Sequence, residues 1–116
     1  MLYHGSCHCQ AVTYEIEADL QQVIACNCSH CSRKGYLLAF APRDALRVKS
    51  GERDLSTYMF NKHVIRHYFC STCGCAPFGE GTNPATSEPM AAINVRCLEG
   101  IEPAELKTMP FDGRSV

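Results

Sequence analysis

The chain has 116 residues, of which 46% are hydrophobic and 20% charged, and its formal net charge is −1. These values are typical of a single globular domain over residues 1–116 and exclude a disordered or fibrous chain. No basic run is present, so neither nucleic acid nor an anionic membrane is a favoured partner.

The amino-terminal stretch MLYHGSCHCQ lacks the basic segment and apolar run of a secretory signal. No apolar stretch approaches the roughly 20 residues that cross a bilayer. We therefore expect a cytoplasmic protein. In a reducing cytosol thiols stay reduced, so nine cysteines indicate metal binding or catalysis rather than disulfides.

Short segments rich in β-branched and aromatic residues predict a mainly β fold with little helix. Turn residues separate these segments at 42–44, 50–52 and 61–62. The predicted strands, in chain order, are residues 11–17, 36–42, 46–50, 55–60, 64–69 and 90–95.

Two further segments are predicted outside the strands. SHCSRKG is the best helical candidate, with Ser29 as the cap at its start and Gly35 as its end. The stretch 79–89, GEGTNPATSEP, is predicted to be a loop. It is either the rim of a site or a plain surface connection.

Two cysteine motifs predict a closed metal site. In CSTCG, two turn residues let Cys70 and Cys73 converge on one zinc ion at about 2.3 Å, and Gly74 can leave the turn at positive φ. The CHC motif offers Cys7 and Cys9 if the backbone bends there. Pairing the two motifs gives a structural site with four thiolates.

The motif CNCSHC holds three thiols, Cys26, Cys28 and Cys31, without an obvious fourth ligand nearby. Three protein ligands are typical of a catalytic zinc site, in which water or an exogenous ligand completes the tetrahedron. Closure by Cys75, by Cys97 or by a histidine is the alternative, and it would make both zinc sites structural. Otherwise Cys75 is a small buried hydrophobe and Cys97 is core or cavity lining.

The histidines are weaker candidates. His30 lies between two cysteine ligands of one turn and is predicted to face solvent, as is His8. His63 and His67 lie four residues apart on one strand face, where a metal pair is conceivable. Exposed positions on that face are the favoured interpretation.

Four stretches spread over residues 5–100, GSCHCQAVTYE, CNCSHCSRKG, RHYFCSTCGCAPFGEG and INVRCLEG, resemble the glutathione-dependent formaldehyde-activating enzymes and their centromere protein V relatives. The resemblance implies a β-tent of small antiparallel sheets around two zinc ions per chain. It implies a structural zinc on Cys7, Cys9, Cys70 and Cys73, and a catalytic zinc on Cys26, Cys28 and Cys31.

The resemblance also implies a carbon–sulfur lyase, similar to S-hydroxymethylglutathione synthase, that adds glutathione or a similar thiol to formaldehyde or another small aldehyde. Glutathione is anionic, so Arg33, Lys34 and Arg96 are candidates to bind it, unless they are ordinary solvated cations. The chain departs from the family at Gln10, where glycine is usual, and at Ser32, where a basic residue is common.

Two hypotheses without catalysis remain open. One is a glutathione or thiol carrier, and the other is an interaction module stapled by zinc. Tyr36, Asn94 and Glu80 are further candidate polar groups of a pocket. Exposed strands in small β domains often pair, which makes a homodimer conceivable, but no sequence feature demonstrates one.

Overall fold

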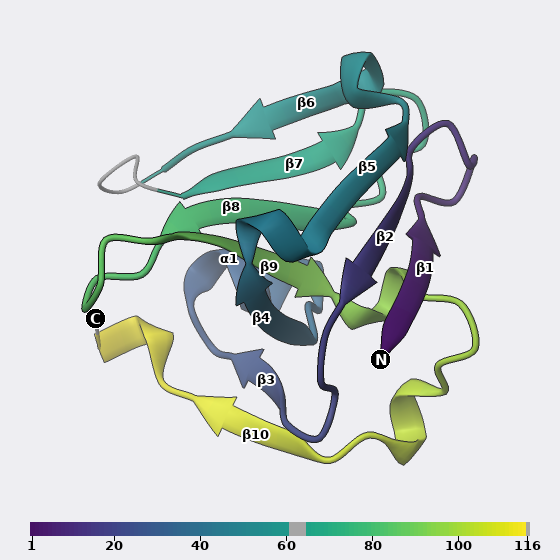
Figure 1. The fold of residues 1–116 in the computed structure, drawn as a ribbon. Helices are drawn as coiled ribbons and strands as arrows, with labels where there is room; N and C mark the ends of the chain where they lie inside the picture. The colour runs from purple at the N-terminus through teal and green to yellow at the C-terminus, as the bar shows by residue number, and fades with distance from the viewer. Residues whose placement is uncertain (61–64, 116) are drawn as a thin grey trace.

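The computed structural model describes residues 1–60 and 65–115 (Figure 1). In this part of the chain no helix is long and apolar enough to cross a membrane. The strands are β1 (Leu2–Ser6), β2 (Thr13–Glu17), β3 (Val23–Cys26), β4 (Leu38–Pro42), β5 (Leu46–Ser50), β6 (Leu55–Tyr58), β7 (Arg66–Cys70), β8 (Phe78–Thr82), β9 (Pro89–Asn94) and β10 (Thr108–Phe111). The helices are α1 (Ser29–Lys34) and the short 3-10 turns η1 (Arg43–Ala45), η2 (Glu52–Asp54), η3 (Val95–Cys97), η4 (Pro103–Glu105) and η5 (Gly113–Ser115).

The strands form two sheets, and the predicted mainly β fold is confirmed. A three-stranded sheet has the order β1-β2-β5, and a seven-stranded sheet has the order β10-β3-β4-β9-β8-β7-β6. All described pairs are antiparallel except β10 and β3, which run parallel with Thr108 opposite Val23. This one parallel pair departs from the antiparallel sheets that the resemblance implies. After β9 the chain bridges to β1 at Leu98 and Gly5, and a long connection then brings β10 alongside β3 (Figure 1).

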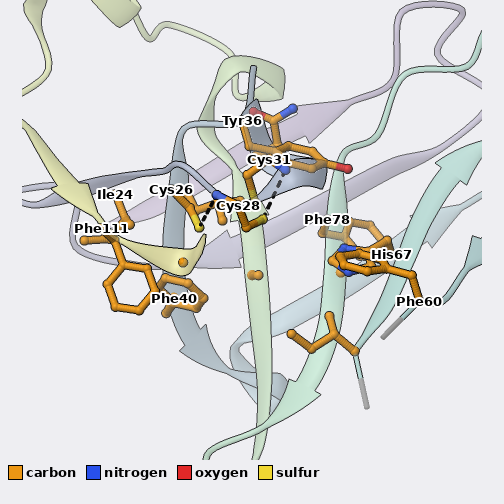
Figure 2. Close-up of a pocket in the computed structure, with 16 residues that line it drawn as sticks. Ile24, Cys26, Cys28, Cys31, Tyr36, Phe40, Phe60, His67, Phe78 and Phe111 are labelled. Atoms are coloured by element: carbon orange, nitrogen blue, oxygen red, sulfur yellow. Dashed lines mark hydrogen bonds between the residues drawn. The ribbon is translucent and has the colours of Figure 1, made fainter. Parts of the chain in front are cut away.

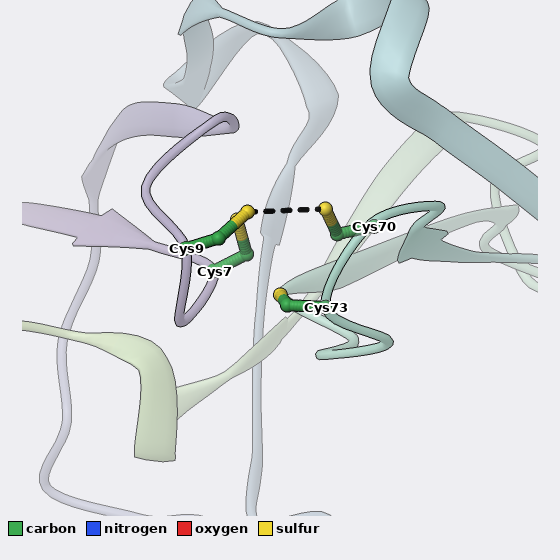
Figure 3. A group of neighbouring side chains, drawn as sticks. All are labelled: Cys7, Cys9, Cys70 and Cys73. Atoms are coloured by element: carbon green, nitrogen blue, oxygen red, sulfur yellow. Dashed lines mark hydrogen bonds between the residues drawn. The ribbon is translucent and has the colours of Figure 1, made fainter.

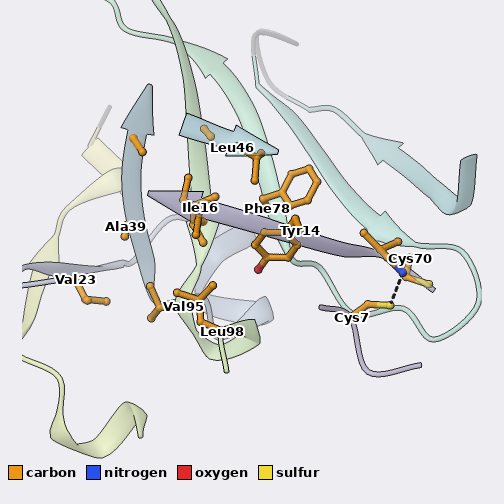
Figure 4. Close-up of a cluster of buried hydrophobic side chains, with 14 residues drawn as sticks. Cys7, Tyr14, Ile16, Val23, Ala39, Leu46, Cys70, Phe78, Val95 and Leu98 are labelled. Atoms are coloured by element: carbon orange, nitrogen blue, oxygen red, sulfur yellow. Dashed lines mark hydrogen bonds between the residues drawn. The ribbon is translucent and has the colours of Figure 1, made fainter. Parts of the chain in front are cut away.

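The hydrophobic core lies between the two sheets. Tyr14 and Ile16 alternate with less buried neighbours on β2, so both point inward, and both are almost fully buried. The Tyr14 ring meets the Phe78 ring of the larger sheet edge to face, with 5.2 Å between the ring centroids (Figure 4). This packing fixes the small sheet against the large one.

The predicted strands all overlap observed ones, and the strand at 46–50 has the predicted bounds. Four strands, β1, β3, β8 and β10, were not predicted. The predicted loop at 79–89 is wrong at its start, because β8 extends to Thr82. A Cβ on Gly79 would lie 2.9 Å from the Arg66 carbonyl oxygen, so glycine is what lets β7 approach β8. The predicted turn at 61–62 lies outside the described residues.

Helix α1 occupies the predicted segment but begins differently. Its N-cap is Cys28 and not Ser29, because the Cys28 backbone is extended and its Sγ accepts the Cys31 N–H at 3.3 Å. Gly35 ends the helix in the left-handed region with φ +72°, as predicted. A residue of the three-cysteine motif therefore caps the helix.

Candidate metal centres and the cavity beside them

The first cysteine cluster joins the two sheets. Cys7 and Cys9 lie in the loop after β1, and Cys70 and Cys73 lie at the end of β7 and in the following turn (Figure 3). The Sγ atoms of Cys7 and Cys9 are 3.6 Å apart, and those of Cys9 and Cys70 are 3.7 Å apart. Sulfurs at 2.3 Å from one tetrahedral ion lie about 3.8 Å apart. The donor set therefore fits a zinc ion.

Backbone N–H groups point at the sulfurs of this four-cysteine cluster. Val12 donates its N–H to Cys7 Sγ at 3.4 Å. Backbone hydrogen bonds from Cys9 and Cys75 lower the pKa of Cys73 to about 6. Such donors favour the thiolate, which is the form that binds metal. The surroundings of Cys70 and Cys73 thus favour the thiolate. The Ala11 backbone hydrogen bond lowers the pKa of Cys9, but burial and the neighbouring thiols outweigh it and raise that pKa.

Two residues in the turns at this cluster have a left-handed backbone conformation. Gly74 has φ +80°, as predicted for the residue that leaves the CSTC turn. Gln10 has φ +66°, a conformation that costs a residue with a Cβ roughly 1 kcal/mol. This geometry explains why glycine suits the position of Gln10.

The second cluster lies at the start of α1. Cys26 ends β3, Cys28 caps α1 and Cys31 lies in its first turn, and their Sγ atoms lie within 4.8 Å of one another (Figure 2). Cys28 donates its N–H to Cys26 Sγ at 3.4 Å. Among the described residues, no fourth cysteine, histidine or carboxylate places a ligand atom within that distance of all three sulfurs.

The electrostatics of the three-cysteine cluster also fit a cation. Burial, reinforced by the neighbouring Cys28 thiol, raises the pKa of Cys31 well above its usual value. Burial opposes ionisation of Cys28 too, but hydrogen bonds led by the Cys31 N–H outweigh it and lower the pKa of Cys28. The three sulfurs cannot all be anionic without a positive ion among them.

The carboxyl-terminal segment covers this cluster, which sequence reasoning missed. Asn27 donates its N–H to the Phe111 carbonyl at 3.0 Å, and Arg114 Nε donates to the Asn27 carbonyl at 2.8 Å. A Cβ on Gly113 would lie 2.4 Å from Cys26 Sγ. No spacing rule links residues more than eighty positions apart, so only the glycine in FDGRS hinted at a close approach.

A cavity of about 550 Å³ lies beside the three-cysteine cluster (Figure 2). Its size is within the usual range of small-molecule sites. Tyr36 and Asn94 line it, as the sequence suggested, together with His67. Burial raises the pKa of Tyr36 to about 12. The rest of the described lining, beyond the three cysteines, is carbon-rich: Ile24, Leu38, Phe40, Phe60, Ile65, Phe78, Gly79, Ala92, Phe111 and Gly113.

The three predicted glutathione-binding cations lie outside this cavity. Arg33 is exposed and donates to the Ser29 carbonyl at 2.9 Å. Arg96 is exposed and its Nε donates to the Gly35 carbonyl at 2.9 Å. The ammonium of Lys34 lies 5.6 Å from the centroid of the Phe69 ring. Their role toward glutathione therefore stays a prediction without a contact to the cavity.

The histidines are placed differently from the sequence prediction. His30 is half-buried, and its ring centroid lies 4.3 Å from that of His67 and 5.2 Å from that of Phe60. The prediction that His30 faces solvent is therefore wrong. The reason is that residues of β7 and the chain after β6 pack against α1. Burial lowers the pKa of His67 to about 4. His8 is exposed as predicted, and His63 lies outside the described residues.

Three other candidates belong to neither cluster. Cys75 packs half-buried against the core, and burial raises the pKa of Cys97 to about 12. Glu80 lies outside the cavity and pairs with Arg43 and with Arg66, the latter at 3.0 Å. Burial opposes its ionisation, but hydrogen bonds from Arg66 and Arg43 outweigh this and lower the pKa of Glu80.

These features define a mainly β protein with one closed cysteine cluster and one cluster that faces a cavity. The family model described as glutathione-dependent formaldehyde-activating enzyme matches residues 2–109, and the chain belongs to this family. The chain is also similar to a Rhodobacter sphaeroides protein whose crystal structure was solved in structural genomics. The two have 35% sequence identity and a TM-score of 0.82, over 92% of this chain and 97% of the other.

Proposed function

We propose that the protein is a zinc-dependent enzyme of the carbon–sulfur lyase type, which joins a thiol to formaldehyde or another small aldehyde. The observation that carries this proposal is the three-cysteine cluster, because three converging thiols face a cavity large enough for substrates. Membership in the family supports the thiol and the aldehyde as substrate classes, with glutathione as the thiol that the family description names.

The reaction balances without any oxidant or further reactant. The thiol R–SH gives up its proton, its sulfur forms a bond to the aldehyde carbon, and the carbonyl oxygen takes up a proton. The product with formaldehyde is R–S–CH₂OH, and the lyase direction is the reverse. A zinc ion, when bound, supplies the positive charge that stabilises a thiolate at neutral pH.

Different residues of the chain would bind the metal ions and contact the substrate. Cys26, Cys28 and Cys31 would hold the ion of the reactive site, and Cys7, Cys9, Cys70 and Cys73 would hold the second ion of the chain. The Tyr36 hydroxyl, which lines the cavity, is a donor for the oxygen on which negative charge develops. The apolar walls exclude water, which strengthens that hydrogen bond.

The test follows exchange between free and hydroxymethylated thiol by NMR with ¹³C-formaldehyde, together with zinc analysis. The wild-type protein is expected to hold two zinc ions per chain and to accelerate exchange for at least one thiol among glutathione and small neutral thiols. Cys28→Ser is expected to stay folded with one zinc and to lose the acceleration. Cys75→Ser is the matched control, because Cys75 belongs to neither cluster.

Three outcomes contradict the proposal. A wild-type protein with two zinc ions that binds thiols but accelerates none of the exchange reactions would be a carrier. Unfolding of Cys28→Ser would favour the interaction module stapled by zinc. A carefully reduced protein without zinc would remove the basis of the mechanism.

A further inference from the structure

The cavity beside the three-cysteine cluster carries information about the substrate. Aromatic rings come from β4, β8 and β10 and from Phe60 after β6, so an occupant would be enclosed mainly by carbon atoms (Figure 2). Burial of apolar surface against such walls is favourable in proportion to the area buried. The rings and aliphatic side chains that matter most here are Ile24, Leu38, Phe40, Phe60, Phe78 and Phe111.

Apart from the three-cysteine cluster, the described walls offer no counter-ion to an ionic substrate. Among the described residues that line the cavity, none is lysine, arginine, aspartate or glutamate. Arg33 and Arg96 are exposed outside it, where each donates to a backbone carbonyl. Lys34 also lies outside it, with its ammonium 5.6 Å from the centroid of the Phe69 ring. Glutathione has two carboxylates and one ammonium group, which would lose hydration without gaining a counter-ion in this cavity. Such transfer is costly for each unpaired charge.

Apart from the three cysteines, the polar side chains among the described lining residues are few and neutral. Asn94 is already engaged, since its Nδ2 donates to the Ala76 carbonyl at 3.0 Å and its Oδ1 accepts the Arg96 N–H at 3.2 Å. The remaining polar groups, the Tyr36 hydroxyl and the His67 ring, suit one oxygen or sulfur atom near the cluster and not a zwitterionic peptide. The chemistry of the walls therefore selects against ionic substituents.

Given the proposed thiol chemistry, on which this step rests, we infer that the preferred thiol is an uncharged one with an aromatic or branched aliphatic substituent rather than glutathione. The thiol group would face the three cysteines and the substituent would fill the apolar part of the cavity. The cavity volume of about 550 Å³ accommodates a phenyl-sized group together with a small aldehyde.

The experiment measures affinity by isothermal titration calorimetry on the zinc-loaded protein, which reports binding without turnover. Three probes are used: 2-phenylethanethiol, glutathione, and ethylbenzene, which has the same ring and no thiol. The aromatic thiol is expected to bind at least tenfold more tightly than glutathione, a difference of about 1.4 kcal/mol. Ethylbenzene is expected to bind more weakly than the aromatic thiol.

A charge placed at the cavity should invert this preference. Phe111 lines the cavity and is 50% exposed, so the Phe111→Arg variant should fold. The second variant is Phe40→Arg, at another lining residue that is 55% exposed. Each variant is expected to bind 2-phenylethanethiol and ethylbenzene at least fivefold more weakly than the wild-type protein and to bind glutathione more tightly. Leu2→Arg is the matched control, because Leu2 is 49% exposed on β1 and does not line the cavity.

The outcomes separate this inference from the proposed function. If glutathione binds as tightly as 2-phenylethanethiol to the wild-type protein, the apolar-substrate inference is wrong and the thiol chemistry still stands. If ethylbenzene binds as tightly as 2-phenylethanethiol, the apolar cavity is supported and the thiol contributes nothing, which contradicts the proposed function. If none of the three probes binds, both fail.

Discussion

The two cysteine clusters share one ligand chemistry but differ in where they stand in the fold. The four-cysteine cluster ties the loop after β1 to the end of β7 and so links the two sheets (Figure 3). The three-cysteine cluster is built from one continuous stretch at the start of α1 and faces a cavity (Figure 2). Position in the fold, and not ligand type, is thus what distinguishes the two clusters.

The largest expected difference comes from removing one thiol from each cluster. Cys70→Ser should leave the protein unfolded at 25 °C, because a structural zinc ion contributes on the order of 10 kcal/mol and whole domains are stable by about 5–15 kcal/mol. Cys28→Ser should lower the free energy of unfolding by less than about 3 kcal/mol, since the core between the sheets stays intact. Circular dichroism during thermal and urea unfolding measures both.

Cys75→Ser controls for the loss of a sulfur near Cys70 and should change stability by no more than about 1 kcal/mol. Equal losses in Cys70→Ser and Cys28→Ser would break the distinction between the two clusters. They would show that both sites are structural, which is the alternative that ligand counting left open.

A smaller effect is expected from the glycine that covers the three-cysteine cluster. In Gly113→Ala the new methyl group would meet Cys26 Sγ at 2.4 Å, a distance that atoms do not tolerate, so the sulfur must move. Zinc analysis should show occupancy falling from two ions per chain toward one, with affinity at this site at least about tenfold weaker. Stability should fall by no more than the roughly 3 kcal/mol expected for Cys28→Ser, since only this one zinc ion is weakened.

The same substitution at Gly81 is the control, because among the described residues a methyl group there meets only Ile65 Cγ1, at 3.4 Å. Gly81→Ala should keep both zinc ions. If Gly113→Ala also kept both with unchanged affinity, the carboxyl-terminal segment would not shape the cluster.

The smallest expected effect concerns the ion pairs that Glu80 forms with Arg43 and Arg66. These contacts stabilise the large sheet and involve neither cysteine cluster. The lowered pKa of Glu80 means that its stabilisation is complete above the unfolded value near 4.5 and is lost as pH falls through the folded value. Glu80→Gln should therefore cost about 1–2 kcal/mol at pH 7, and the gap to wild type should shrink below pH 4.5. Urea unfolding across this pH range measures the gap.

Glu88→Gln, at an exposed carboxylate of the loop after β8, is the control for adding an amide. Acid releases zinc from all of these proteins alike, so the gap and not the absolute stability reports on Glu80. A gap that stays constant down to pH 3 would show that the carboxylate's charge does not stabilise the sheet. Zinc content at pH 7 should be unchanged in both variants.

Strand prediction succeeded where side chains are buried in a regular pattern and failed where pairing alone makes the strand. The segment 46–50 has the pattern and was placed within its observed bounds. β8 contains two glycines and reads as a loop, yet the absence of a Cβ at Gly79 is what permits its pairing. β10 is exposed throughout and contains Pro110, so only its partner β3 defines it.

The amino-acid sequence by itself determined the mainly β class through local periodicity, and the grouping of cysteines through the spacing of ligands in short motifs. It indicated the family through four stretches that resemble its members. Only the tertiary structure decided that the carboxyl-terminal segment covers Cys26, that His30 packs against His67, and that the candidate cations lie outside the cavity. Those facts depend on contacts between segments that are distant in the sequence. Such contacts, and not the neighbouring residues in the chain, set the burial and the charge at a site.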